Sequence, residues 1–113
     1  MVNLVDPIYG YYEWRPSDTH PYIGQFILKE RRDYMEIWSV SISSENRGKG
    51  YGQKMIGEAI NIARQKSLSK PLKLYVEKNN SRAIHVYEKC GFKTTGNYAG
   101  KVGAWTMTYM PTE

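Results

Sequence analysis

The chain lacks several features that would assign it to a class by themselves. Its 113 residues include one cysteine, Cys90, so no internal disulfide can form and the fold must rest on its core. No apolar stretch approaches the roughly 18 residues of a membrane-spanning helix. The start of the chain also lacks the charged and apolar regions of a secretion signal. These absences exclude a disulfide scaffold and favour a cytoplasmic protein with no membrane partner.

The chain also lacks histidines and cysteines at the spacing that metal sites use. His20 precedes a proline in a predicted turn, and neither His20 nor His85 has a histidine or cysteine partner at the spacing that metal sites use. Cys90 is better explained as a small core residue than as a nucleophile. We therefore expect no metal site.

No repeat, low-complexity tract or long flexible linker divides the chain, and we expect a single domain over residues 1–113. The composition, 41% hydrophobic and 24% charged, is that of a globular protein. Sixteen Lys and Arg against eleven Asp and Glu leave a formal net charge of +5. This charge favours an anionic partner, and both a nucleic acid and a phosphorylated cofactor satisfy it.

Periodicity predicts strands at both ends of the chain and helices between them. The expected elements are a hairpin from 8–15 and 22–28, a strand over 34–43, a helix from the glycine-rich residues 47–52 to about 67–69, a strand over 72–77, a helix over 80–90, and two strands within 92–110. This order predicts a mixed α/β (α+β) domain with two main helices and at least one crossover connection.

The glycine-rich turn Arg47-Gly48-Lys49-Gly50-Tyr51-Gly52 lies between a predicted strand and a predicted helix. Such a turn can hold phosphate, because glycines let the backbone approach an anion and the first amides of a helix are free. Arg47 and Lys49 add positive charge. The turn matches neither the Walker A pattern nor the dinucleotide fingerprint. Without further context, a plain tight turn before a helix stays open as the alternative.

Three segments together resemble the GNAT superfamily of acyl-CoA N-acyltransferases. Residues 47–52 are similar to its signature [Q/R]-x-x-G-x-[G/A], and residues 80–92 are similar to its second signature, N-x-x-A-I-x-x-Y-E-K-x-G-F. Residues 36–44 resemble the strand that leads into the phosphate loop. The resemblance covers roughly residues 34–92. It implies a largely antiparallel GNAT-like sheet and transfer of an acetyl group from acetyl-CoA directly to a primary amine, through a tetrahedral intermediate.

The same resemblance assigns binding roles. In GNAT enzymes the loop amides hold the pyrophosphate of coenzyme A, and the preceding strand pairs with its pantetheine arm so that one N–H faces the thioester oxygen. Carried over, the cofactor-binding residues are Val40, Ser41, Ile42, Arg47, Gly48, Lys49, Gly50, Tyr51, Gly52, Gln53 and Asn80. Asn80 is also expected to cap its helix.

Two side chains take catalytic roles by resemblance. Tyr87 stands where the family places a tyrosine that protonates the departing thiolate, although a helical tyrosine on an apolar face also fits simple core packing. Glu36 is the candidate base for the amine, and partial burial would raise its pKa towards neutrality. Its alternative is an ordinary solvated strand residue.

The N-terminal region departs from the family pattern. Family members usually begin with a strand and one or two helices that form much of the acceptor-binding wall, and we expect this chain to lack them and to start almost at the second strand. Apolar surface left open there would favour a homodimer.

Two other function classes stay open. One is a noncatalytic acyl-CoA-binding or regulatory module of the same fold. The other is a basic nucleic-acid-binding domain, which the charge and the abundance of Tyr and Trp suggest but no binding motif supports. The sequence does not identify the amine acceptor.

Overall fold

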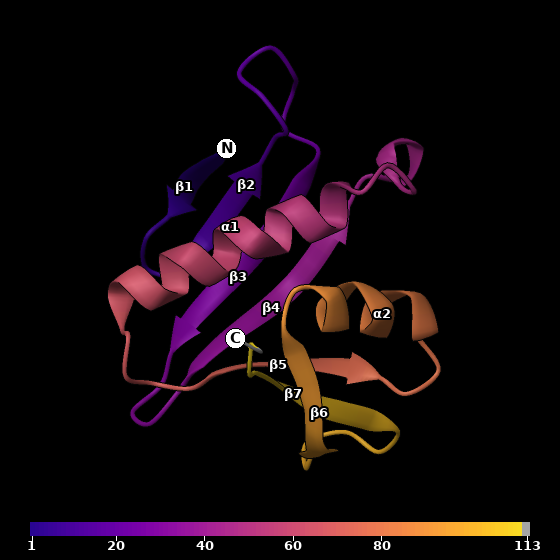
Figure 1. Cartoon of the computed structure of the whole chain (residues 1–113). Helices are drawn as coiled ribbons and strands as arrows, with labels where there is room; N and C mark the ends of the chain where they lie inside the picture. Colours follow the sequence, from indigo (N-terminus) through magenta and orange to yellow (C-terminus); the bar gives the residue numbers. More distant parts are fainter. Residues whose placement is uncertain (112–113) are drawn as a thin grey trace.

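A computed structural model describes residues 1–111 of the chain. These residues form two α-helices and a seven-stranded sheet of order β1-β2-β3-β4-β5-β7-β6 (Figure 1). The elements are β1 (Val2–Asp6), β2 (Tyr11–Trp14), β3 (Gly24–Glu30), β4 (Met35–Ile42), η1 (Ser44–Asn46), α1 (Tyr51–Lys66), β5 (Leu72–Glu77), α2 (Ser81–Lys89), β6 (Phe92–Asn97) and β7 (Ala104–Tyr109). Neighbouring strands are antiparallel except β4 and β5, which are parallel. The predicted mixed, largely antiparallel sheet with two helices is confirmed.

The first predicted hairpin is confirmed as the pair β2 and β3. Alternate residues of these strands are buried, because successive side chains of a strand point to opposite faces of the sheet. Tyr12 and Trp14 of β2 and Phe26 and Leu28 of β3 all belong to the core. They define the face of the sheet that the helices cover.

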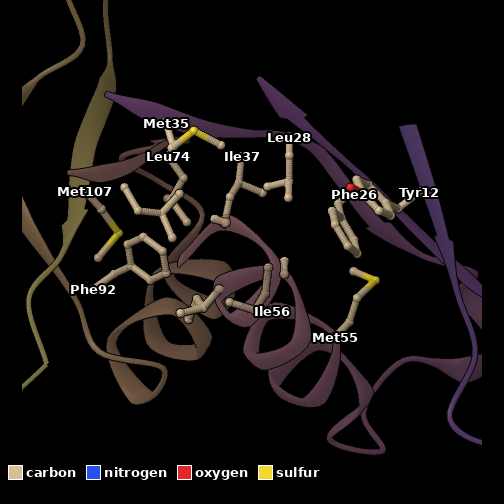
Figure 2. Packing of buried hydrophobic residues seen from close by; sticks show 14 of the residues in the cluster. Tyr12, Phe26, Leu28, Met35, Ile37, Met55, Ile56, Leu74, Phe92 and Met107 are labelled. Atoms are coloured by element: carbon tan, nitrogen blue, oxygen red, sulfur yellow. The ribbon is translucent and has the colours of Figure 1, made fainter. Parts of the chain in front are cut away.

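Both helices pack on this one face (Figure 1). The apolar stripe predicted for the first helix is buried as a whole, and it consists of Met55, Ile56, Ala59, Ile60 and Ala63. Figure 2 shows the labelled side chains of α1 pointing towards those of the strands. None of the residues of the shorter helix α2 is fully buried.

The expectation that the first strand is missing is wrong. Residues Val2–Asp6 form β1, which pairs with β2 so that Val2 lies opposite Trp14. A turn follows, in which the Asp6 carboxylate accepts hydrogen bonds from the backbone N–H groups of Ile8 (3.0 Å) and Tyr9 (3.3 Å). Periodicity could not indicate β1, because it is an edge strand whose three central residues are all exposed. No helix lies between β1 and β2 in residues 1–111, as expected.

The parallel pairing of β4 and β5 is short. It runs from Met35 opposite Leu72 to Ile37 opposite Leu74 and ends there. Beyond this point β4 continues beside β3 and β5 continues beside β7. Figure 1 shows the two strands diverging, with α2 beside the opening. The sheet therefore splits in its middle, and no strand of residues 1–111 lies beside the inner edge of β4 beyond Ile37.

Neither helix of residues 1–111 combines the length and the apolar character that crossing a lipid bilayer requires.

Candidate active site

β4, whose inner edge is open, contains a β-bulge in its pairing with β3. Gln25 pairs with Ser41 and Ile27 pairs with Trp38, so one residue of β3 lies opposite both Ser39 and Val40. Ser39 has a φ of 54°, and it is the only residue other than glycine with positive φ in residues 1–111. Bulges and strained backbone of this kind are typical of functional sites, where they re-aim backbone groups. The sequence does not indicate the bulge, because it depends on the register between β3 and β4.

A groove of about 540 Å³ starts at this edge and runs to the N-termini of α1 and α2. Eleven predicted site residues line it: Val40, Ser41, Ile42, Arg47, Gly48, Gly50, Tyr51, Gly52, Gln53, Asn80 and Tyr87. Two predicted site residues, Lys49 and Glu36, do not. The structure thus brings the start of the second helix, which lies much later in the sequence, to the strand and the glycine-rich loop.

The glycine-rich loop has the backbone conformation that an anion site needs. Gly48 and Gly50 both have a φ of 78°, in the left-handed region that side chains disfavour. Gly50 is the N-cap of α1 and provides no side-chain hydrogen bond to the helix, so the first amides of α1 stay available. A Cβ atom at Gly50 would meet nothing within 4 Å. Backbone N–H groups at a helix N-terminus are a ready site for phosphate.

The charges along the groove are all of one sign. Arg47, Arg82 and Lys89 line it, and none of its lining residues carries a carboxylate. Arg82 comes from α2 and approaches the loop from the opposite wall, since a Cβ atom at Gly48 would lie 3.5 Å from a terminal nitrogen of its guanidinium. The residue types and the backbone therefore fit the phosphates of coenzyme A. The sequence signature did not indicate Arg82 or Lys89 as ligands, because it assigns neither of them a binding role.

Asn80 and Tyr87 lie where this groove meets a second cavity. The Asn80 side chain caps α2 by accepting a hydrogen bond from the N–H of Ala83 (3.2 Å), as expected, and this leaves its NH₂ group free for a ligand. Burial, with a smaller contribution from Cys90, raises the pKa of Tyr87 to about 12. The Tyr87 hydroxyl therefore keeps its proton at neutral pH.

The second cavity, of about 490 Å³, passes through the split in the sheet. Val40, Asn80 and Tyr87 line both cavities. The second cavity is also lined by Leu74 and Val76, which point to the helix face, and by Tyr75 and Glu77, which alternate with them and point to the opposite face. A molecule entering from that opposite face would reach Tyr87 and the end of the groove.

Glu36 is buried behind this cavity, with 3% of its surface exposed. Its carboxylate pairs with the guanidinium of Arg31, whose Nε lies 2.5 Å away. Burial alone would raise the pKa of Glu36, but the neighbouring Tyr75 hydroxyl and Arg31 guanidinium lower it below its usual range. The expectation of a raised pKa is therefore wrong, and Glu36 is a carboxylate at neutral pH.

An aromatic cluster on the cavity wall was not anticipated. The rings of Trp38, Tyr75 and Tyr98 line the cavity together, and the Tyr75 and Tyr98 centroids are 4.1 Å apart. The indole N–H of Trp38 is buried and has no hydrogen-bond partner of standard geometry in residues 1–111. This N–H is close enough to Glu36 to help lower the pKa of its carboxyl. The three rings come from β4, β5 and the β6–β7 connection, so no local pattern in the sequence joins them.

Known structures share this fold. The PaiA N-acetyltransferase from Thermoplasma acidophilum, solved in complex with coenzyme A, superposes with a TM-score of 0.73 at 24% identity, over 88% of this chain and 59% of that protein. The spermidine N-acetyltransferase from Vibrio cholerae, in complex with coenzyme A and spermine, gives a TM-score of 0.74 at 22% identity, over 87% of this chain and 63% of that protein. At these identities the likeness establishes the fold alone.

Curated relatives match at the sequence level. The mycothiol acetyltransferase of Corynebacterium glutamicum is 37% identical over 76 residues, which are 66% of this chain and 26% of the relative. The spermidine N(1)-acetyltransferase of Vibrio cholerae is 30% identical over 60 residues, which are 53% of this chain and 35% of the relative. The matches to these and two further relatives span between 19% and 35% of each relative's length.

The family model described as the acetyltransferase (GNAT) family matches residues 6–92. This range contains the bulge, the glycine-rich loop, Asn80 and Tyr87. It extends well before the segment 34–92 that the signatures indicated, and it includes the first hairpin. The chain therefore belongs to the GNAT acetyltransferase family.

Proposed function

We propose that this protein is an N-acyltransferase that moves an acetyl group from acetyl-CoA to a primary amine by direct transfer. The observation that supports it most is the junction of two cavities at Val40, Asn80 and Tyr87. One cavity is cationic, free of carboxylates and placed at two helix N-termini, which suits the phosphates of acetyl-CoA. The other opens on the far face of the sheet and gives the amine its own route to the same point.

The backbone of β4 takes the donor in this proposal. The segment from Val40 to Ile42 has no strand neighbour towards β5, so its free backbone groups pair with the extended pantetheine arm as a strand would. One of its N–H groups faces the thioester oxygen and stabilises the negative charge that develops there during attack by the amine. The tetrahedral intermediate then collapses by losing the thiolate.

Tyr87 completes the transfer. A C–N bond forms to the acetyl carbon and the C–S bond breaks, so the departing sulfur gains an electron pair and needs a proton. The Tyr87 hydroxyl, which stays protonated because burial raises its pKa to about 12, supplies this proton. The proton that the amine releases returns, through solvent, to re-form the hydroxyl.

Glu36 acts indirectly in this proposed reaction. Its carboxylate lines neither cavity. The Tyr75 hydroxyl beside it belongs to a side chain that lines the second cavity, which takes the amine in this proposal and is called the acceptor cavity below. We propose that the amine proton reaches Glu36 through this hydroxyl or a neighbouring water. The lowered pKa makes Glu36 a weak base, so it holds this proton only briefly before the proton returns through the same hydroxyl or water to solvent.

The noncatalytic acyl-CoA-binding module is the second candidate. The same position and lowered pKa of Glu36 favour it, because they leave the acceptor cavity without a free carboxylate base of its own: Glu77, which lines the cavity, is paired with Lys101 at 2.6 Å. A module of this kind would bind acetyl-CoA and release no free thiol with any amine.

Calorimetric titration with acetyl-CoA separates these candidates from the nucleic-acid-binding class. We expect saturable one-to-one binding of acetyl-CoA and of desulfo-CoA, and no comparable binding of an oligonucleotide. Thiol release during incubation with an amine panel then tests transfer. Absence of coenzyme binding would refute both the enzyme and the module, whereas binding without thiol release would leave the module.

A further inference from the structure

The acceptor cavity has an aromatic wall on the face of the sheet that the helices leave open. Trp38, Tyr75 and Tyr98 form it, and their ring centroids are 5.3 Å apart for Trp38 and Tyr75, 6.4 Å for Trp38 and Tyr98, and 4.1 Å for Tyr75 and Tyr98. Mutual packing of the three rings holds them in place. The lining on the other side of the cavity is largely aliphatic and includes Ile37 and Leu74.

Among residues 1–111, both carboxylates near this wall are paired with a cation. Glu77 at the cavity pairs with Lys101 at 2.6 Å, and Glu36 behind the wall pairs with Arg31 at 2.5 Å. The ammonium group of Lys29 lies 5.1 Å from the Trp38 ring centroid and adds a third cation. Two carboxylates therefore face three cations, and the surroundings of the cavity are net positive.

From these two observations we infer that the acceptor is a monoamine whose body is an aromatic or flat apolar group. The inference rests on the proposed function and narrows its acceptor. A flat apolar body gains contact with the tyrosine rings by stacking and loses water on both surfaces. A single amine needs no carboxylate partner in the cavity, because it loses its positive charge when it is deprotonated for attack.

A polyamine meets the opposite conditions. Each further ammonium group needs a carboxylate or a desolvated aromatic face. Here both carboxylates are paired and Lys29 already lies over Trp38, so only the rings of Tyr75 and Tyr98, which the apolar body would occupy, are left. The net positive surroundings also repel a second charge. This distinguishes the chain from the spermidine N(1)-acetyltransferase of Vibrio cholerae, whose named substrate carries several positive charges. The cavity volume of about 490 Å³ suits a small molecule.

A matched acceptor panel tests the inference. The amines are 2-phenylethylamine, n-butylamine and spermidine, and kcat/KM is measured for each by thiol release from acetyl-CoA. We expect 2-phenylethylamine to exceed both others by about tenfold or more, the range that filling one apolar subsite gives. Equal or higher values for n-butylamine or spermidine would overturn the inference.

A variant pair ties the preference to the wall. Tyr98→Ala removes one of the three rings of the wall without touching the groove, and we expect it to reduce the preference for 2-phenylethylamine over n-butylamine several-fold. Tyr22→Ala is the control, because Tyr22 packs under Arg15 and lines neither cavity. An unchanged preference in Tyr98→Ala, with acetyl-CoA affinity intact, would also overturn the inference.

Failure of the proposed function is recognised separately. If acetyl-CoA binds but no amine releases thiol, the enzyme proposal fails, and the three amines are titrated calorimetrically into the protein saturated with desulfo-CoA. Saturable binding of 2-phenylethylamine without binding of spermidine would still support the aromatic acceptor site. Binding of spermidine, or of no amine, would refute it.

Discussion

The groove on the helix side and the cavity through the sheet meet at Val40, Asn80 and Tyr87, yet they are built from different parts of the chain. The groove consists mainly of backbone at a glycine-rich loop and of cations on α2. The cavity consists mainly of side chains from β4, β5 and the β6–β7 connection. A phosphate needs backbone amides in a fixed conformation, which glycines at set positions provide, whereas an acceptor needs a shaped surface that many residue sets can form. Hence a local sequence pattern identifies the groove and not the cavity.

Tyr87→Phe gives the largest expected effect, because it acts at the junction of the two regions. Loss of the acidic hydroxyl should lower kcat on the order of 100-fold, while acetyl-CoA affinity stays nearly unchanged. With a pKa of about 12, Tyr87 itself should cause no loss of activity with rising pH below about pH 11. Steady-state kinetics across pH, beside calorimetry, measure both. A kcat equal to that of the wild type would show that Tyr87 only packs against Phe92, its T-shaped ring neighbour.

Gly50→Val breaks the groove by itself. A β-branched residue at a φ of 78° is strained and should reduce stability by about 1–3 kcal/mol. The loop should no longer present its amides to the diphosphate, and acetyl-CoA affinity, measured by calorimetry, should fall about 10- to 100-fold, as for loss of one or two charge-assisted hydrogen bonds.

Gly57→Val is the matched control for this change. Gly57 lies within α1, has no positive φ, lies outside the groove, and its added Cβ would also meet nothing within 4 Å. It should bind acetyl-CoA as the wild type does. If both variants bind equally well, the loop does not hold the phosphates.

Two substitutions of Asn80 distinguish its role in helix capping from its role in ligand binding. Asn80→Asp keeps an acceptor for the N–H of Ala83 and should retain the stability of α2, but it exchanges the free NH₂ group for a negative charge. We expect acetyl-CoA affinity to fall about tenfold. Asn80→Ala should instead lose about 1 kcal/mol of stability with a smaller loss of affinity. Thermal unfolding and calorimetry measure the two quantities, and unchanged affinity in Asn80→Asp would leave Asn80 as a cap alone.

The sequence predicts those parts of the fold that repeat with a regular period. The stripe from Met55 to Ala63 and the alternation of β5 identified their elements within a few residues. The sequence does not predict β1, whose Leu4 and Val5 are adjacent and both 46% exposed. An edge strand that is stabilised by its backbone pairing needs no alternation of apolar and polar residues. The sequence also does not predict the bulge at Ser39, since the register between β3 and β4 is set by tertiary packing.

The sequence also does not predict the direction in which the pKa of Glu36 shifts. The partial burial expected of Glu36 is exceeded, since only 3% of its surface is exposed. Its ion partner Arg31 lies across the turn before β4, and the Tyr75 hydroxyl comes from the neighbouring strand β5. Only the assembled sheet brings both groups to the carboxylate and reverses the direction that burial alone would give.

Arg31→Met gives the smallest expected effect and acts on the acceptor side alone. In the wild type the lowered pKa of Glu36 contributes stability above the unfolded-state pKa, and this contribution is lost as pH falls through the folded-state pKa. Without Arg31 the pKa of the buried carboxyl rises, so the variant should be less stable than the wild type near pH 7, and the difference should shrink in acid. Thermal unfolding near pH 7 and near pH 4 measures it.

Arg32→Met is the control for this variant, because Arg32 makes no ion pair among residues 1–111. It should match the wild type at both pH values. Acetyl-CoA affinity should stay unchanged in both variants, since Arg31 and Glu36 lie outside the groove. A loss of stability in Arg31→Met that is equal at both pH values would mean that Arg31 contributes packing and not charge. The view that Glu36 is held as an ion pair by Arg31, and is therefore not a free base for the acceptor cavity, would then lose its support.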